Sequence, residues 1–135
     1  MILMKGLAAN VTKPLIPGTK LMCHDNSGAK VIEIFGVVGA KSVRSRFVCA
    51  GIGQVVIASV KKGNPDMVMK VVKALIIRQK KEFRRPNGMR LSFEDNAAVL
   101  VTDDGLPVGT EVKGVVAREI FERFPKVSAI SAGIV

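Results

Sequence analysis

The sequence predicts a single all-β domain, either a small barrel or a sandwich. Five short segments rich in apolar and β-branched residues follow one another, separated by turns that contain glycine, proline or asparagine. A length of 135 residues suits one domain, and a hydrophobic content of 48% is enough to build a core without disulfide or metal cross-links. We therefore treat residues 1–135 as one unit.

The first and fourth of the predicted strands are the most informative. The first ends in the turn-forming run 25–28, whose sequence is Asp-Asn-Ser-Gly. The fourth is apolar on both faces from Val71 onward, so we expect both of its faces to be buried. The five predicted strands are residues 19–24, 31–38, 51–60, 69–77 and 97–101.

A helix is predicted only near the C-terminus, over residues 118–124. Ile120, Phe121 and Phe124 fall on one face of this helix, and Pro125 disfavours its continuation. Residues 91–135 carry four positive and seven negative side chains, so this last third of the chain is slightly acidic.

Positive charge is concentrated in the middle of the chain. The formal net charge is +10, from 21 Lys and Arg against 11 Asp and Glu. Residues 41–90 hold thirteen of the positive side chains and only two negative ones, so they account for the whole surplus. A surplus of this kind points to a polyanionic partner, most often nucleic acid.

The segment 78–94 is predicted to be a long hairpin with a basic tip. Pro86, Asn87 and Gly88 form its turn, since proline fixes one backbone angle and the other two residues tolerate positive φ. Nine residues per arm reach roughly 30 Å at about 3.3 Å per residue. That exceeds the height of a compact barrel wall, so we expect the tip to project as a ribbon.

The arms of this hairpin are predicted to pair so that opposed residue numbers sum to 175. This register places Leu75 opposite Leu100 at the buried base of the hairpin. It also places Lys81 opposite Glu94 nearer the tip. Apolar side chains then face each other, as do opposite charges, and both arrangements favour the pairing.

The cations of the ribbon and of two loops are the candidate RNA contacts. Arginine offers a planar fork and lysine a point charge, and both grip phosphates. A solvated strand edge is the alternative for the ribbon, but six cations in thirteen residues fit it poorly. Each loop cluster taken alone fits a solvated loop equally well. The candidates are Lys41, Arg44 and Arg46 in one loop, Lys61 and Lys62 in the other, and Arg78, Lys80, Lys81, Arg84, Arg85, Asn87 and Arg90 in the ribbon.

The aromatic content favours one class of nucleic acid. The chain has six Phe and neither Tyr nor Trp, so it offers few platforms on which unpaired bases can stack. Folded RNA, gripped by its shape and backbone, is therefore the expected ligand. A chromatin-type barrel that binds nucleic acids in general remains an alternative on charge alone.

Catalysis, cofactor binding and membrane association have little support. The lone His24 lies beside a turn, and adjacent carboxylates on a strand point to opposite faces. Cys23 and Cys49 lack a C-x-x-C pairing, so we expect two buried thiols in a reducing, cytosolic compartment and no metal. The start of the chain lacks the apolar stretch of a signal peptide, and no apolar run approaches the ~20 residues that span a bilayer.

A series of spaced motifs runs through the predicted hairpin. The motifs are Ala74-Leu75-Ile76-Ile77, nine residues, Asn87-Gly88, four residues, Phe93, two residues, Asn96, two residues and Val99-Leu100. This series closely resembles the signature of the universal ribosomal protein L-fourteen family. Runs 25–30, 107–110 and 117–119 are similar to other landmarks of that family, and the match extends from about residue 18 to the C-terminus.

The resemblance implies a fold. It implies a five-stranded barrel with a projecting ribbon at 78–94 and short helices within 117–135. The extension at 1–17 and the Asn-Pro-Asp turn look like the archaeal and eukaryotic type of the family.

The resemblance also implies partners. These are large-subunit ribosomal RNA, neighbouring proteins of the L-three and L-twenty-four types, and small-subunit RNA across an intersubunit bridge. Docking of the anti-association factor (initiation factor six) is implied as well, on a ribosome in the cytoplasm. The candidate protein-facing surface is Arg118, Glu119, Phe121, Glu122 and Phe124.

Overall fold

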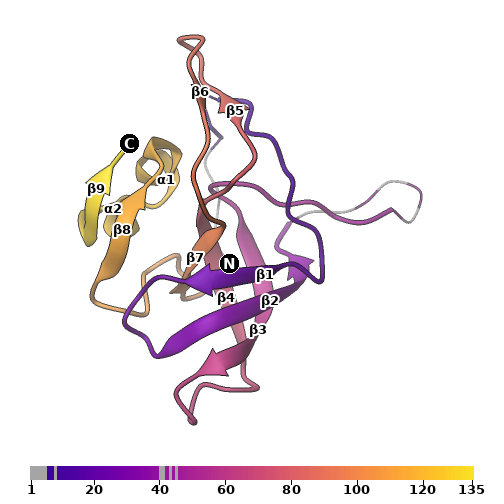
Figure 1. Cartoon of the computed structure of the whole chain (residues 1–135), viewed down its shortest axis with the longest axis vertical. Helices are drawn as coiled ribbons and strands as arrows, with labels where there is room; N and C mark the ends of the chain where they lie inside the picture. The colour runs from indigo at the N-terminus through magenta and orange to yellow at the C-terminus, as the bar shows by residue number, and fades with distance from the viewer. Residues whose placement is uncertain (1–5, 8, 40–41, 43, 45) are drawn as a thin grey trace.

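The computed structural model describes residues 6–7, 9–39, 42, 44 and 46–135. Five strands close into a barrel in the order β1-β2-β3-β4-β7, which confirms the all-β prediction and decides for the barrel over the sandwich (Figure 1). A two-stranded ribbon of β5 (Phe83–Arg84) and β6 (Arg90–Leu91) rises from one end of the barrel, and the C-terminal elements lie beside it. The barrel strands are β1 (Lys20–Cys23), β2 (Ala29–Val37), β3 (Val55–Gly63), β4 (Val71–Arg78) and β7 (Ala97–Val101).

The barrel core is filled by aliphatic side chains that alternate along the strands. In β2, Ile32 and Ile34 are buried while the neighbouring Phe35 is 54% exposed, as expected where successive side chains point to opposite faces. In β4, burial on both faces holds for Ala74–Ile77 only. Val71 is 66% exposed, so the prediction for the start of this strand was wrong.

The predicted register between β4 and β7 was wrong by one residue. Leu75 lies opposite Val99, and Ile76 lies opposite Ala98, so paired numbers sum to 174. The error begins at the turn, where Arg85 rather than Pro86 bonds Met89, and the ribbon pairs already sum to 174. A β-bulge between Ile76 and Arg78 then shifts the register locally by one residue. Only the pair beyond the bulge, Arg78 with Ala97, keeps the predicted sum.

The barrel closes through a parallel pair of strands. β1 runs antiparallel to β2 on one side and parallel to β7 on the other, where Met22 and Cys23 lie opposite Ala97 and Ala98. Cys23 is buried beside this seam, and burial, reinforced by the charge of Asp25, raises the pKa of its thiol to about 12. Cys49 is only half-buried, so the expectation of two buried thiols holds for one of them.

The C-terminal module comprises two strands and two short helices. β8 (Val112–Val116) and β9 (Ser131–Ile134) form a parallel pair, and α1 (Arg118–Arg123) and α2 (Pro125–Ala129) connect them. The predicted helix therefore exists, and Pro125 separates it from a second one by occupying the first turn of α2. None of the helices in the described ranges is long and apolar enough to span a membrane.

The ribbon is shorter in its pairing than predicted. The ladder between β5 (Phe83–Arg84) and β6 (Arg90–Leu91) has two residue pairs, Phe83 with Leu91 and Arg84 with Arg90, and no Lys81–Glu94 pair. The tip is a tight turn in which the Asn87 side chain accepts a hydrogen bond from the Met89 amide at 3.0 Å. The ribbon nevertheless projects well beyond the barrel, as expected (Figure 1).

Candidate nucleic-acid interface

The exposed face of the ribbon carries most of its predicted cations. Lys80, Lys81 and Arg84 are all exposed. Arg90 is exposed too, but its guanidinium donates to Glu82 at 2.8 Å. A surface ion pair of this kind contributes little to stability, so Arg90 can exchange this partner for a phosphate at small cost.

The two predicted loop clusters lie apart from each other, and Lys61 and Lys62 lie within strand β3, so their placement in a loop was wrong. Arg44 and Arg46 are exposed in the long loop between β2 and β3, which extends sideways from the barrel (Figure 1). Lys41 lies outside the described residues. Lys61 and Lys62 are exposed near the far end of β3, away from the ribbon, and Lys61 lies 3.4 Å from Glu33. The predicted cations therefore form separate groups around the barrel.

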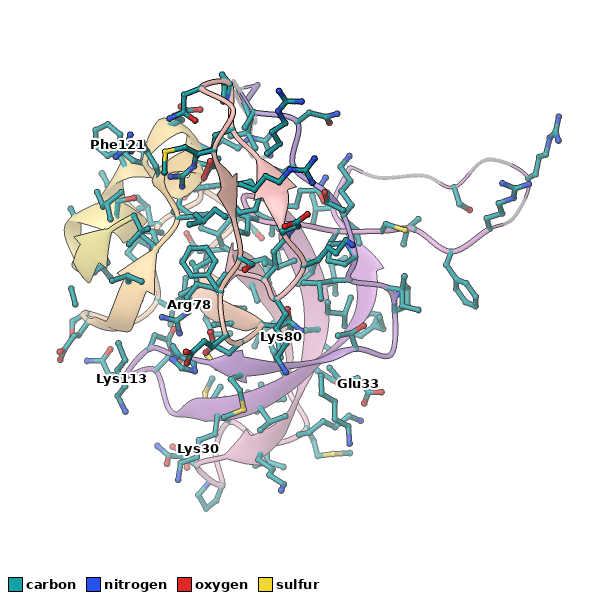
Figure 2. The ribbon with its side chains drawn as sticks, turned by 45° about the horizontal axis from the view of Figure 1, so that its top comes forward. Lys30, Glu33, Arg78, Lys80, Lys113 and Phe121 are labelled. Atoms are coloured by element: carbon teal, nitrogen blue, oxygen red, sulfur yellow. The ribbon has the colours of Figure 1, made fainter. Side chains whose placement is uncertain are left out.

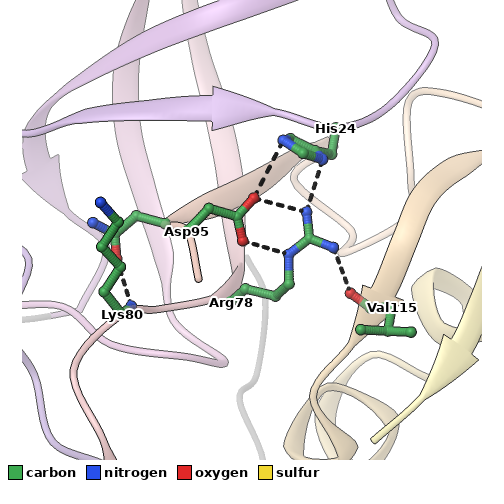
Figure 3. Close-up of polar contacts among 6 residues, drawn as sticks. His24, Arg78, Lys80, Asp95 and Val115 are labelled. Atoms are coloured by element: carbon green, nitrogen blue, oxygen red, sulfur yellow. Dashed lines mark hydrogen bonds and ion pairs between the residues drawn. The ribbon is translucent and has the colours of Figure 1, made fainter. Parts of the chain in front are cut away.

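Arg78 does not belong to the exposed set. It is only 6% exposed, because it sits where β4 meets the C-terminal module (Figures 2 and 3). Its Nη1 donates to the Val115 carbonyl at 3.0 Å, and its Nη2 lies 2.7 Å from His24 Nδ1. Its Nε lies 3.1 Å from Asp95 Oδ1, at an ion-pair distance but without hydrogen-bond geometry. Its expected role as an RNA contact does not fit this position.

The Arg78 contacts determine the state of His24. An arginine always donates, so His24 Nδ1 must be unprotonated to accept from it. Burial, followed by the positive charge of Arg78, lowers the pKa of His24, which keeps the ring neutral. Gly114 makes room for this arrangement, because a Cβ there would collide with Arg78 Nη1. The contacts of Arg78 with His24, Asp95 and Val115 therefore hold the C-terminal module against the barrel.

Arg85 is also held inside the protein. Its Nε and Nη2 donate to the two carboxylate oxygens of Glu119 at 2.9 and 3.3 Å, and Nη2 donates to the Val135 carbonyl at 2.6 Å. The guanidinium lies over the Phe83 ring, 5.7 Å from its centre. The side chains of Arg85 and Glu119 are 14% and 5% exposed. This pair clamps the ribbon to α1, so neither residue fits its expected contact with an outside partner.

The predicted protein-facing surface is reduced to one side of α1. Phe124 is buried against the core, because the helix turns this face inward with Ile120. Arg118 and Glu122 are exposed, and Phe121 is 55% exposed and points outward at the edge of the molecule (Figure 2). The remaining candidate surface consists of the Phe121 side chain and the charged side chains of Arg118 and Glu122.

Gln79 is a buried polar residue that the sequence reasoning missed. It is fully buried at the base of the ribbon, where the Ile52 amide donates to its Oε1 at 3.0 Å. A glutamine between two basic residues carries no pattern that distinguishes it from a solvated one. In the described part of the chain, no group of three or more His, Cys, Asp and Glu could hold a metal ion.

Comparison with known proteins identifies the family. A model of the family described as ribosomal protein L14p/L23e matches residues 15–135. Proteins named large ribosomal subunit protein uL14 are 49% identical in Methanocorpusculum labreanum, 50% in Methanothrix thermoacetophila and 51% in Methanospirillum hungatei. Each match covers 98% of this chain and 100% of the relative. These relatives are archaeal, in line with the expected type. The chain therefore belongs to the ribosomal protein L14p/L23e family, the family that its hairpin motifs predicted.

Proposed function

We propose that this protein is a structural, non-catalytic constituent of the large ribosomal subunit that binds ribosomal RNA through its ribbon and loops. The observation that carries the proposal is the set of exposed cations, Lys80, Lys81 and Arg84, on a ribbon that projects from the barrel. The loop cations Arg44 and Arg46 add a second point of contact. Separate basic groups suit an RNA that surrounds the barrel, since each group can meet a different part of a folded backbone.

The ribbon is tested by the salt dependence of RNA binding. In the variant with Lys80, Lys81 and Arg84 all changed to Ala, the log–log slope of affinity against salt is expected to flatten. Each lost phosphate contact lowers this slope by roughly 0.7–0.9, so the expected change is about 2 to 3. The measurement is filter binding of the full chain to deproteinised large-subunit ribosomal RNA at several salt concentrations.

A matched control separates a contact from an effect of net charge. Lys30, Lys70 and Lys126 are exposed and lie outside the candidate groups, so their replacement by Ala makes the same change in charge. An equal loss of slope in both triple variants would mean that only net charge matters. Duplex DNA bound as well as the RNA would favour the chromatin-type alternative.

We infer that the exposed side of α1 faces protein partners at the intersubunit face. Phe121 is the anchor of this surface, with Arg118 and Glu122 beside it. Exposed aromatic side chains with charged neighbours are typical of docking sites. The anti-association factor and proteins of the L-three and L-twenty-four types are the partners that fit, with small-subunit RNA reached across a bridge.

The α1 surface is tested by Phe121→Glu. Large subunits reconstituted with this variant are expected to bind the anti-association factor at least tenfold more weakly, because the apolar anchor becomes a charge. RNA affinity of the isolated protein should change less than twofold. Phe35→Glu is the control, since Phe35 is 54% exposed on the barrel, close to the 55% of Phe121. Equal losses of factor binding in the two variants would contradict the assignment of the surface to α1.

A further inference from the structure

The N-terminal segment, defined as residues 9–15, lies against the ribbon. Asn10 forms an antiparallel bridge with Arg84 in β5. At the other end of the segment, Leu15 and Ala50 exchange two backbone hydrogen bonds of 3.0 and 2.7 Å. The segment thus rises beside β5 and β6 as a third, irregular member of the ribbon (Figure 1).

Gln79 fastens this segment to the base of the ribbon. Its Nε2 donates to the Thr12 carbonyl at 3.1 Å and to the Lys81 carbonyl at 3.0 Å. Its Oε1 accepts from the Ile52 amide at the turn before β3. One buried amide therefore joins three stretches of backbone that are distant in sequence, and both of its donor hydrogens are used.

Gly51 shows how closely the segment is packed. A Cβ at this position would lie 2.6 Å from the Thr12 carbonyl oxygen and 3.2 Å from Gln79 Oε1. A side chain here would push the segment away from the barrel, so the close approach depends on glycine.

Two hollows flank the N-terminal segment, and each has cations in its wall. One, of about 210 Å³, is lined by Lys13 and Arg123 beside Gln54. The other, of about 320 Å³, is lined by Arg84 and Arg85 at the ribbon tip. Lys13 is exposed, and Arg123 donates to the Gly53 carbonyl at 2.9 Å. The segment thus carries one exposed cation of its own, Lys13, and borders Arg84 of the ribbon at its other end.

We propose that the N-terminal segment is part of the RNA interface, with Lys13 as a phosphate contact and Gln79 as the residue that positions the segment beside the ribbon. The inference rests on the proposed RNA-binding function and deepens it. Fixing the segment before binding reduces the entropy lost on association, so its contacts add affinity that a loose chain end would not give.

The first test compares two lysines. In the full chain bound to deproteinised large-subunit ribosomal RNA, Lys13→Ala should lower the log–log salt slope by roughly 0.7–0.9. Lys70→Ala makes the same charge change at an exposed position near the far end of the barrel and should leave the slope unchanged. If Lys13→Ala behaves as Lys70→Ala does, Lys13 is not a contact and the inference fails.

The second test addresses Gln79. Gln79→Met removes all three hydrogen bonds while keeping the size of the side chain. Gly51→Ala instead pushes on the Thr12 carbonyl directly while the Gln79 amide is kept. Both are expected to weaken RNA binding at least threefold, and Lys13→Ala should add no further loss in the Gln79→Met background. Val60→Ala, a core change at the other end of β3, controls for lower stability as measured by Tm. If RNA affinity follows Tm equally in all three variants, Gln79 is merely structural and its positioning role is refuted.

The two levels of the proposal fail differently. If the ribbon triple variant lowers the salt slope as expected but Lys13→Ala does not change it, the N-terminal segment is not part of the interface. The proposed function would then still stand. No change of slope in the ribbon triple variant would overturn the proposed function itself.

Discussion

Replacing Arg85 with Met is expected to lower the free energy of unfolding by about 3 kcal/mol, because it leaves the Glu119 carboxylate buried without its partner. Glu119 is 4% exposed and accepts two hydrogen bonds from the Arg85 guanidinium. The substitution also removes the hydrogen bond to the Val135 carbonyl and the contact of the guanidinium with the Phe83 ring. Urea unfolding followed by circular dichroism measures the change.

A double variant and a neighbouring control sharpen this expectation. Arg85→Met combined with Glu119→Leu should recover much of the loss, since replacing both members of a buried pair by apolar residues is often neutral. Arg84→Met changes the neighbouring exposed cation and should shift stability by no more than ~0.5 kcal/mol. If Arg85→Met were as mild as Arg84→Met, the clamp between ribbon and α1 would not stabilise the fold.

Replacing Arg78 with Met is expected to cost about 2 to 3 kcal/mol and to loosen the C-terminal module before the barrel. The change removes the donors to the Val115 carbonyl, to His24 Nδ1 and to Asp95 Oδ2. A fully buried polar group left unpaired costs about 1–3 kcal/mol, and these three acceptors are only partly buried. Asp95 is partly exposed, so water compensates for part of its lost ion pair. Hydrogen exchange should show the amides of β8 and β9 losing protection more than those of β2 and β3.

Two further variants test the cause of this effect. Arg46→Met removes an exposed loop cation and should leave both stability and exchange unchanged. Gly114→Ala should reproduce the loosening, because its Cβ would displace the Arg78 guanidinium and because Gly114 has a φ of +80°. Uniform loss of protection throughout the barrel would contradict a local role for Arg78.

Much of the fold was predictable because the barrel strands follow simple rules of burial. β7 has the predicted bounds, Ala97–Val101, since a short run of apolar residues between polar turns leaves little freedom. The register was not predictable, because the turn residues allow more than one pair to close the ribbon tip. The bulge after Ile76 also depends on how the strand bends around the core. The parallel pairing of β8 and β9 was missed. In β8, Lys113 and Gly114 separate Val112 from Val115 and Val116, so the sequence lacks the continuous β-branched run that predicts a strand.

The candidate site was predictable in its location but not in every residue. The concentration of positive charge in residues 41–90 pointed to the ribbon and loops, where exposed cations are indeed found. Arg78 and Arg85 have the same charge and similar neighbours in sequence, yet both are held by internal partners. Their partners, Val115 and Glu119, are more than thirty residues away, so only the folded structure brings them together.

The parallel seam between β1 and β7 has a consequence for the order in which the protein folds. Met22 and Cys23 cannot complete their pairing until Ala97 and Ala98 have left the ribosome that synthesises the chain. Closure therefore waits for most of the sequence, whereas the β2–β3 and β3–β4 pairings join neighbouring strands and can form earlier. During translation β1 is therefore expected to stay a half-paired edge until β7 emerges and closes the ring.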